Sequence, residues 1–129
     1  MLTIWFIRHA QSQANAGEKT CVPAAIALTP LGREQAVHVA SVFEHGPDLV
    51  ISSPYLRAQQ TAELLFERFP NVRRETWPVQ EFTYLCQDRC RNTTLHERLP
   101  LADEYWKRKD PYYRDGGGAE SFADLMGRV

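Results

Sequence analysis

The chain has 129 residues and a formal net charge of −1, and this length is sufficient for one domain with a hydrophobic core. The near-neutral charge argues against nucleic acid or an anionic membrane as a partner. No apolar run approaches the roughly 20 residues that span a bilayer, and the N-terminus lacks the basic region of a signal peptide. We therefore expect a single cytoplasmic domain over residues 1–129 that binds neither nucleic acid nor a membrane.

The N-terminal segment of residues 2–7 is apolar at nearly every position and rich in β-branched and aromatic side chains. This composition predicts a buried strand. Arg8 and His9 follow it directly. Ligands of α/β sheets bind at the carboxyl ends of the strands, and a cation beside an imidazole can hold an oxyanion and supply a nucleophile. The alternative is that both side chains are solvated loop residues.

The next segment, residues 11–29, is polar and is predicted to be a loop, and loops of this length in compact domains are usually functional. Within it, Asn15 follows His9 closely enough to fold back toward it. A helix is predicted from Pro30, because Thr29 is a good N-cap and proline fits the first helical position.

The same pattern of a strand followed by a helix then occurs again. Residues 49–51 predict a short buried strand, and two serines and a proline precede a second helix that begins near Tyr55. Arg57 falls in the first turn of this helix, where the helix dipole favours anions over cations. An arginine beside free helix N–H groups is suited to binding phosphate.

The rest of the chain predicts one more strand and two helices. We expect an edge strand at 72–78, irregular chain at 82–100, a helix at 100–109, a glycine-rich loop at 110–118 and a last helix from about residue 120. The order β-α-β-α-β, followed by helices, is typical of an α/β protein with a largely parallel sheet. The ends of the first two strands would bring Arg8, His9 and residues 53–57 together.

Three motifs occur in order along the chain. They are Arg8-His9-Ala10 with the downstream Asn15, residues 28–36 (LTPLGREQA) and residues 52–62 (SSPYLRAQQTA). Together they resemble the histidine phosphatase superfamily, also called phosphoglycerate mutase-like, over essentially the whole chain. The resemblance implies a three-layer α/β/α sandwich with a largely parallel sheet. The first motif of the family normally reads Arg-His-Gly, so Ala10 is a departure, one that the family tolerates in places.

The resemblance implies a phosphomonoester hydrolase that works through a phosphohistidine intermediate. His9 would be the nucleophile, Arg8 and Arg57 would bind the phosphoryl oxygens, and Asn15 would sit at the pocket edge. Glu81 falls where the family carries its general acid and base, and its alternative is a solvated loop carboxylate. No metal or other cofactor is implied. These groups fit the chemistry, because a nucleophile divides hydrolysis into two steps and arginines neutralise the transition state.

The family also carries a second pocket histidine at the end of a late strand, and no counterpart occurs before Val129. His96 could approach the pocket, but its sequence context does not match that motif. We therefore expect a chain truncated at its C-terminus, missing the last strand and helix of the fold. The alternative function is a non-catalytic or weakly active module that binds phospho-ligands. Alternatively, the chain folds as it stands and covers its exposed sheet edge by oligomerising or by swapping elements, and we expect a homodimer if the chain is soluble alone.

The expected substrate is a phosphorylated small molecule or a phosphoprotein. The compact spacing after Glu81 favours a phosphatase, since mutases of the family typically have a longer insertion there. The basic and aromatic residues at 105–109 and 112–114 form either a lid that reads the substrate or an ordinary amphipathic helix.

The three cysteines are Cys21, Cys86 and Cys90, an odd number without a C-x-x-C pair, so a disulfide framework is not expected. Two thiols at helical spacing, without further ligands, are a weak zinc signal. We predict reduced, structural thiols, with a zinc or redox site as the alternative.

Overall fold

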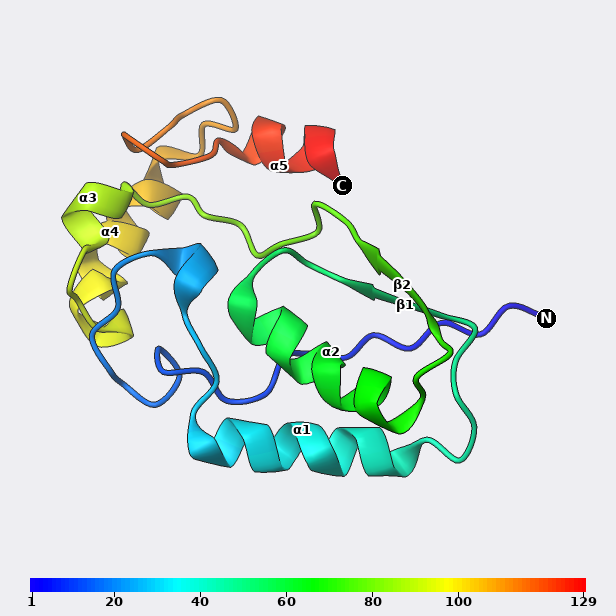
Figure 1. Cartoon of the computed structure of the whole chain (residues 1–129). Helices are drawn as coiled ribbons and strands as arrows, with labels where there is room; N and C mark the ends of the chain where they lie inside the picture. The colour runs from blue at the N-terminus through cyan, green and yellow to red at the C-terminus, as the bar shows by residue number, and fades with distance from the viewer.

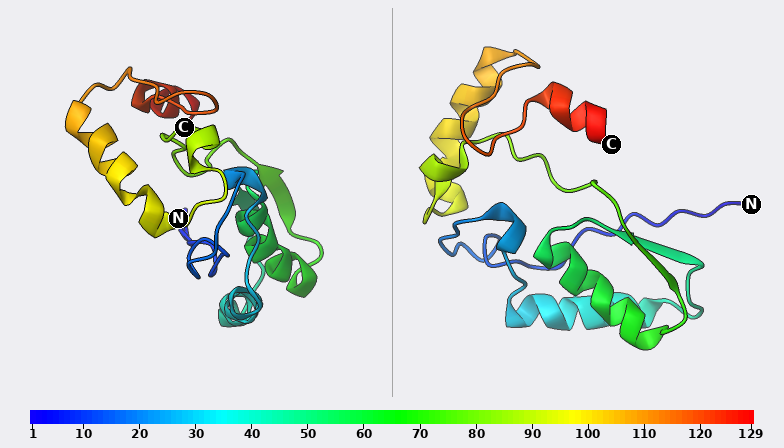
Figure 2. Two further views of the ribbon diagram at one scale, coloured as in Figure 1. Left: turned by 90° about the vertical axis from the view of Figure 1, so that its left-hand side faces the viewer. Right: turned by 45° about the horizontal axis from the view of Figure 1, so that its top comes forward.

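The computed structural model describes all residues from Met1 to Val129. Its elements form two groups, which lie on opposite sides of the molecule (Figures 1 and 2). The first group contains the 3-10 helix η1 (Pro23–Ala25), α1 (Pro30–Val42), β1 (Leu49–Ser52), α2 (Leu56–Arg68) and β2 (Arg73–Thr76). The second group contains three helices, α3 (Gln87–Cys90), α4 (Leu95–Arg108) and α5 (Phe122–Arg128).

The sheet is parallel, as the sequence predicts, and consists of β1 and β2. Leu49 pairs with Arg73 and Ser52 with Thr76, in a register without a bulge. Helix α2 packs against β1, and α1 packs against α2 through small buried side chains, among them Ala36. Small residues on these faces let the two helices approach closely, because they leave little side-chain volume between the backbones. The α/β class is thereby confirmed.

Helix α1 begins as its sequence predicts. Thr29 Oγ1 accepts a hydrogen bond from the Gly32 N–H at 3.0 Å, and Pro30 occupies the first helical turn. Gly32 is buried, and a Cβ added to it would overlap the carbonyl oxygen of Gln11. That carbonyl also accepts a hydrogen bond from the Thr29 N–H at 3.1 Å. The start of α1 therefore holds the backbone just after His9 in place.

Replacing Gly32 by alanine is expected to destabilise the chain by about 2 kcal/mol, because the new methyl group forces the Gln11 backbone away from α1. The matched control is Gly127→Ala in α5, where a Cβ meets nothing within 4 Å. This control should gain up to ~1 kcal/mol from helix propensity. Urea unfolding followed by circular dichroism measures both free energies of unfolding. Equal stability of the two variants would contradict the close approach of Gly32 to Gln11.

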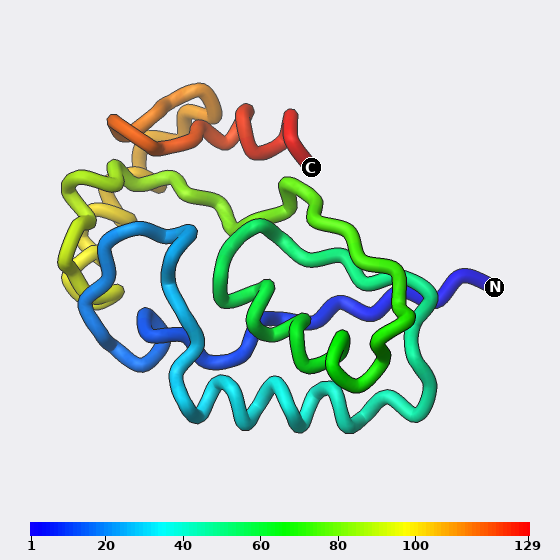
Figure 3. The backbone as a smooth tube through the Cα atoms, viewed as in Figure 1, coloured from blue at the N-terminus to red at the C-terminus, as the bar shows by residue number.

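The prediction of a buried strand at residues 2–7 is wrong. This segment has no regular secondary structure, and its backbone is extended (dark blue in Figure 3). Leu2 and Phe6 are 84% and 94% exposed, and Trp5 makes an edge-on ring contact with Phe43 at 5.8 Å. A strand requires a hydrogen-bonded neighbour as well as apolar side chains, and β1 pairs only with β2. The homodimer stays a prediction, which light scattering tests.

The prediction of irregular chain over 82–100 is also wrong in part, because α3 lies there and α4 begins at Leu95 rather than at Pro100. Thr94 caps α4 in a reciprocal arrangement with Glu97. The Glu97 N–H donates to Thr94 Oγ1 at 3.2 Å, and the Thr94 N–H donates to Glu97 Oε2 at 2.7 Å. The sequence Thr-Leu-His-Glu is the signature of this capping box, and it indicates the helix start more strongly than the proline does.

The second group of elements is held together by an aromatic cluster. Tyr105 of α4 is buried, and its ring lies 4.7 Å from that of Tyr84 and 5.2 Å from that of Trp106. Phe82 makes edge-on contacts with Tyr105 and with Phe122 of α5. The cluster fixes α4 against the chain that follows β2, and so positions the residues at 81–85.

The stability of the start of α5 depends on the ionisation of Asp124 and therefore on pH. Asp124 accepts hydrogen bonds from Arg114 at 2.7 Å and from the Ser121 N–H and O–H at 2.8 Å. The Arg114 guanidinium, followed by Ser121, lowers the pKa of Asp124 to about 2. This stabilisation is present above the unfolded pKa of roughly 3.9 and is lost as the pH falls through about 2.

We expect Arg114→Gln to move the pKa of Asp124 upward, toward its unperturbed range, because the charged donor is lost. A carboxyl-detected NMR titration measures the shift, and Arg91→Gln, which removes an exposed arginine from a different carboxylate, is the control. An unchanged Asp124 titration in Arg114→Gln would show that the ion pair does not form in solution.

No helix in the structure combines the length and the apolar character that crossing a membrane requires.

Candidate active site

A cavity of about 360 Å³ lies between the two groups of elements. Its lining comes from the chain around residues 8–26, from the start of α2, and from residues 81–102. Three arginines, Arg8, Arg57 and Arg98, and one carboxylate, Glu81, supply its charged side chains. Positive charge therefore exceeds negative charge in the cavity, which favours an anionic ligand.

His9 reaches this cavity although the segment before it is not a strand. The Ala10 N–H donates to Thr61 Oγ1 at 3.1 Å, and the Thr61 hydroxyl donates to the Arg57 carbonyl at 2.7 Å. Both Thr61 and Arg57 belong to α2. Helix α2 thus fixes the backbone next to His9 from one side, while the start of α1 fixes Gln11 from the other.

The hydrogen bonds of His9 select one tautomer. Nδ1 lies 2.8 Å from the Ala10 carbonyl oxygen, and Nε2 receives the Arg57 Nε–H at 3.2 Å. A carbonyl oxygen only accepts and a guanidinium only donates, so Nδ1 carries the proton and Nε2 presents its lone pair. His9 is therefore arranged as a neutral imidazole with its basic nitrogen in the cavity.

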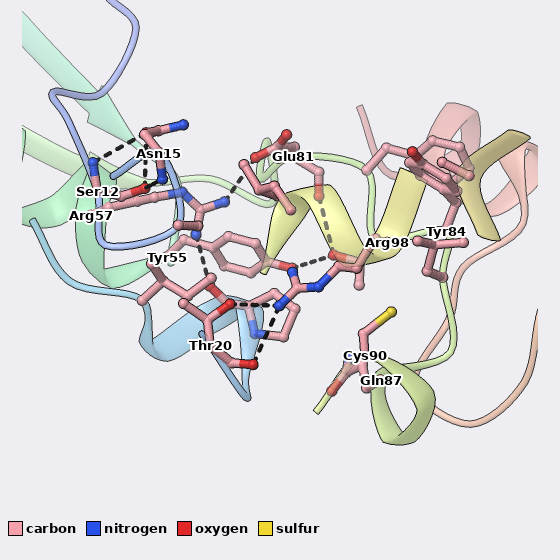
Figure 4. A pocket seen from close by; sticks show the side chains of 18 of the residues that line it. Ser12, Asn15, Thr20, Tyr55, Arg57, Glu81, Tyr84, Gln87, Cys90 and Arg98 are labelled. Atoms are coloured by element: carbon pink, nitrogen blue, oxygen red, sulfur yellow. Dashed lines mark hydrogen bonds and ion pairs between the residues drawn. The ribbon is translucent and has the colours of Figure 1, made fainter. Parts of the chain in front are cut away.

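Arg57 connects three separate parts of the site through its guanidinium group. It is 6% exposed and donates from Nε to His9 and from Nη1 to the Pro23 carbonyl at 2.7 Å. Its Nη2 donates to Glu81 Oε2 at 2.9 Å, and Figure 4 shows Arg57 and Glu81 joined in this way. Its guanidinium carbon also lies 4.9 Å from the centre of the Tyr55 ring. A fork of donors with this geometry suits the oxygens of a phosphoryl group.

Asn15 and Arg8 line the same cavity from the N-terminal side. The Asn15 side-chain oxygen accepts from the Ser12 N–H at 3.1 Å and from the Ser12 hydroxyl at 2.8 Å. This turn fixes the Asn15 side chain in the lining of the cavity (Figure 4). Arg8 is exposed and lines the cavity. The structure thus brings the five predicted site residues to one cavity.

The position of Glu81 is set mainly by hydrogen bonds to the backbone of the residues just before it, and less by contacts of its own side chain. Its carboxylate side chain is 71% exposed and pairs with Arg57. Arg128 of α5 donates to the carbonyl of Pro78 at 2.7 Å and to that of Gln80 at 2.9 Å. Arg128 is itself fixed by Glu120, whose pKa its hydrogen bond lowers. Helix α5 therefore fixes the chain that carries Glu81.

Sequence reasoning missed Arg98, which lies in α4 and lines the cavity. The capping box at Thr94 predicts this helix and could have revealed Arg98, which lies four residues after the cap. His96, which the sequence left as a possible neighbour of the pocket, is exposed and does not line the cavity. Residues 105–109 and 112–114 do not line the cavity either, and this disfavours the lid.

The cysteines form no disulfide, and two of them, Cys21 and Cys90, line the cavity. All three are free thiols, and Cys86 and Cys90 are buried around α3. Burial raises the pKa of the Cys90 thiol, which keeps it protonated at neutral pH. No three side chains of His, Cys, Asp and Glu are grouped so that they could hold a metal ion.

The sequence profile of the histidine phosphatase superfamily (branch 1) matches residues 4–129. This chain therefore belongs to the histidine phosphatase superfamily, and the predicted phosphoglycerate mutase-like α/β fold is confirmed. No curated protein matches the chain in sequence.

Solved structures are similar to the chain over most of its length. A mycobacterial hydrolase ("hydrolase 1") is 30% identical with a TM-score of 0.67, and the match covers 93% of this chain and 57% of that one. A mycobacterial glucosyl-3-phosphoglycerate phosphatase is 31% identical with a TM-score of 0.65, covering 94% and 57%. The alpha-ribazole phosphatase from Shigella flexneri shares the fold, at 24% identity and a TM-score of 0.68, covering 95% and 60%. The chain thus spans less than two thirds of the length of each.

Proposed function

We propose that this chain hydrolyses phosphomonoesters through a phosphohistidine formed on His9. One observation carries the proposal: the buried guanidinium of Arg57 bonds His9 Nε2 and Glu81 Oε2 at the same time. A nucleophilic nitrogen and a carboxylate therefore flank one anion-binding fork. Membership of the superfamily and the similarity to a glucosyl-3-phosphoglycerate phosphatase support the same chemistry.

In the first step, the lone pair of His9 Nε2 attacks phosphorus and the bond from phosphorus to the ester oxygen breaks. Arg57 transfers its hydrogen bond from Nε2 to a phosphoryl oxygen, which frees the lone pair as the substrate binds. Arg8 and Arg57 neutralise the equatorial oxygens of the transition state. Glu81, in its protonated form, gives its proton to the departing alkoxide, so an alcohol leaves.

In the second step, water attacks the phosphorus of the phosphohistidine. The Glu81 carboxylate accepts a proton from this water as the phosphorus–nitrogen bond breaks. The bonding electrons return to Nε2, which restores the neutral imidazole, and inorganic phosphate leaves. The Nδ1–H bond to the Ala10 carbonyl holds the ring in one orientation during both steps.

The cavity favours a small molecule over a phosphoprotein as the substrate. Its volume of about 360 Å³ is within the range of small-ligand sites, and its lining mixes apolar side chains with a few charged ones. Apolar residues, among them Ile26, Leu95 and Leu99, also line the cavity. They would contact the organic part of the ester.

The second candidate function is a module that binds phospho-ligands without hydrolysing them. One observation favours it: His9 is the only histidine that lines the cavity. Arg8, Arg57 and His9 could hold a phosphate there without turnover.

The test is incubation of the full chain with p-nitrophenyl phosphate, followed by an alkaline quench and mass spectrometry. We expect release of p-nitrophenol together with a phosphorylated peptide that contains His9. Because phosphohistidine is labile in acid, an acid quench should remove the modification, and this distinguishes it from a phosphoserine. Phosphate binding without release of p-nitrophenol would favour the binding module and overturn the hydrolase.

A further inference from the structure

Tyr55 contacts both charged parts of the candidate site, and the proposed hydrolysis gives it no role. It is the residue that precedes α2, and its side chain does not cap that helix. The side chain is half-buried and lines the cavity together with Arg57 and Glu81 (Figure 4). Its ring lies 4.9 Å from the guanidinium carbon of Arg57, within the range of a cation–π contact. The ring therefore supports the group that is proposed to bind phosphate.

The hydroxyl of Tyr55 is bonded to the segment that carries Glu81. Tyr55 Oη lies 2.6 Å from Thr83 Oγ1, a short hydrogen bond between residues 28 positions apart. Thr83 Oγ1 in turn donates a longer hydrogen bond, of 3.4 Å, to the carbonyl oxygen of Glu81. A carbonyl oxygen only accepts, so the Thr83 proton is used there and the Tyr55 hydroxyl is the donor to Thr83. The contacts thus run from the start of α2 to the backbone of Glu81.

Thr83 is held from two sides. On the side of α5, the Thr83 N–H donates to Glu120 Oε2 at 3.1 Å, and the Glu120 N–H donates to the Thr83 carbonyl at 2.9 Å. On the side of α2, the Tyr55 hydroxyl holds its side chain. Glu81 is only two residues away, so these contacts limit where its carboxyl group can lie.

The bond between Tyr55 and Thr83 matters most in the reacting state. The Glu81 side chain is 71% exposed, and its ion pair with Arg57 requires the carboxylate form. The proposed proton donor is the protonated form, in which this ion pair is lost. The bond from Tyr55 to Thr83 joins two neutral hydroxyl groups and does not depend on the charge of Glu81. It therefore still connects the start of α2 to the Glu81 segment when the acid is ready to act.

We propose that Tyr55 is a positioning residue, whose hydroxyl acts through Thr83 to hold the Glu81 carboxyl group at the leaving oxygen of the ester. This assignment rests on the proposed function, because it takes Glu81 as the proton donor and Arg57 as the phosphoryl-binding group. Tyr55 itself transfers no proton to the substrate. Its ring and its hydroxyl link the anion-binding fork to the acid, so that both keep one relative position.

The assignment predicts how the rate depends on the leaving group. Because release of the alcohol completes the first step, kcat/KM includes the proton transfer from Glu81 and excludes the later attack of water. Help from a general acid matters more as the leaving oxygen becomes more basic. p-Nitrophenolate leaves readily without a proton, phenolate less readily, and the alkoxide of benzyl alcohol least of all. p-Nitrophenyl, phenyl and benzyl phosphate therefore form a series that depends increasingly on Glu81.

Tyr55→Phe removes the hydroxyl and keeps the ring against Arg57. We expect the ratio of kcat/KM for benzyl phosphate to that for p-nitrophenyl phosphate to fall about 10-fold, with phenyl phosphate between them. Thr83→Val removes the same hydrogen bond from the other partner and should give the same fall, whereas Thr83→Ser keeps a hydroxyl and should restore the wild-type ratio. The matched control is Tyr112→Phe, since Tyr112 is 78% exposed and does not line the cavity, and its ratio should stay at the wild-type value.

A Glu81→Gln chain shows whether Tyr55 acts through Glu81. Glutamine cannot give up a proton, so this variant should show the full dependence on the leaving group. Adding Tyr55→Phe to it should change the ratio by less than about twofold, because effects that pass through one group are not additive. Urea unfolding of each variant shows that it is folded under the conditions of the assay.

Equal losses with all three esters in Tyr55→Phe would overturn the assignment, because the hydroxyl would then only stabilise the fold. A further fall of the ratio when Tyr55→Phe is added to Glu81→Gln would also overturn it, since Tyr55 would act without Glu81. Both results leave the proposed function in place if the wild-type chain releases p-nitrophenol. A wild-type chain that hydrolyses none of the esters would reject the proposed function, and the assignment of Tyr55 with it.

Discussion

Substitution of His9 by glutamine is expected to lower kcat with p-nitrophenyl phosphate by at least about 10³-fold and to abolish the phosphorylated peptide. Glutamine keeps a polar group of similar size but offers no basic nitrogen, so the covalent step cannot occur. Steady-state release of p-nitrophenol measures the rate, and the alkaline-quench experiment measures the intermediate. Inorganic phosphate should still bind, since Arg8 and Arg57 remain.

Two other histidines provide the controls for this substitution. His38 lies on the exposed face of α1, and His96 lies exposed on α4 outside the cavity. His38→Gln and His96→Gln are both expected to keep the wild-type rate within about twofold. A large loss in His96→Gln would place a second histidine in the reaction, contrary to its position in the structure. Retention of the phosphopeptide in His9→Gln would assign the nucleophile to another residue.

Substitution of Arg57 by lysine is expected to reduce kcat/KM by about 10²- to 10³-fold, equivalent to roughly 2.7–4 kcal/mol of transition-state stabilisation. The lysine keeps the charge but has one nitrogen in place of the fork that reaches His9, Glu81 and the Pro23 carbonyl. Because Arg57 is buried, the change also leaves a carbonyl without its donor, at a cost of about 1–3 kcal/mol in folding. Activity assays and urea unfolding on the same preparation report the two effects separately.

The matched control is Arg33→Lys, since Arg33 also lies in the first turn of a helix but is exposed. Its rate and its free energy of unfolding should both stay near the wild-type values. If Arg57→Lys retained activity within about threefold, the fork geometry of Arg57 would have no role in the transition state. If it merely unfolded, Arg57→Gln measured below the unfolding midpoint would still report the loss of kcat/KM.

Local signals in the sequence were sufficient for most elements of the first group. Thr29 and Pro30 predicted the start of α1, and the structure confirms the cap that Thr29 forms. The repeated succession of strand and helix predicted a parallel sheet, and β1 and β2 are parallel. The same reasoning failed for residues 2–7, because apolar composition reports a tendency to be buried and carries no information about whether a neighbouring strand is present.

Long-range contacts decided the second group. Residues 82–100 lack a clear apolar periodicity, and the sequence therefore did not predict the helical part of this segment. The capping box at Thr94 is present in the sequence and does indicate a helix start there. What holds α4 is the aromatic cluster around Tyr105, whose members are distant in sequence. The position of Arg98 in the cavity depends on this packing and on its bonds to Thr20, and no local pattern predicts either.

The sequence by itself determined which chemical groups the protein has available: an imidazole, several guanidinium groups and a carboxylate, in motifs that identify the superfamily. Only the tertiary structure decided how these groups are arranged relative to one another. It assigned the proton to Nδ1 of His9 and the lone pair to Nε2, buried the fork of Arg57 between His9 and Glu81, and placed Arg98 in the same cavity. The physical reason is that tautomer, desolvation and charge balance depend on distances of a few ångströms between residues far apart in the chain, which no local sequence pattern specifies.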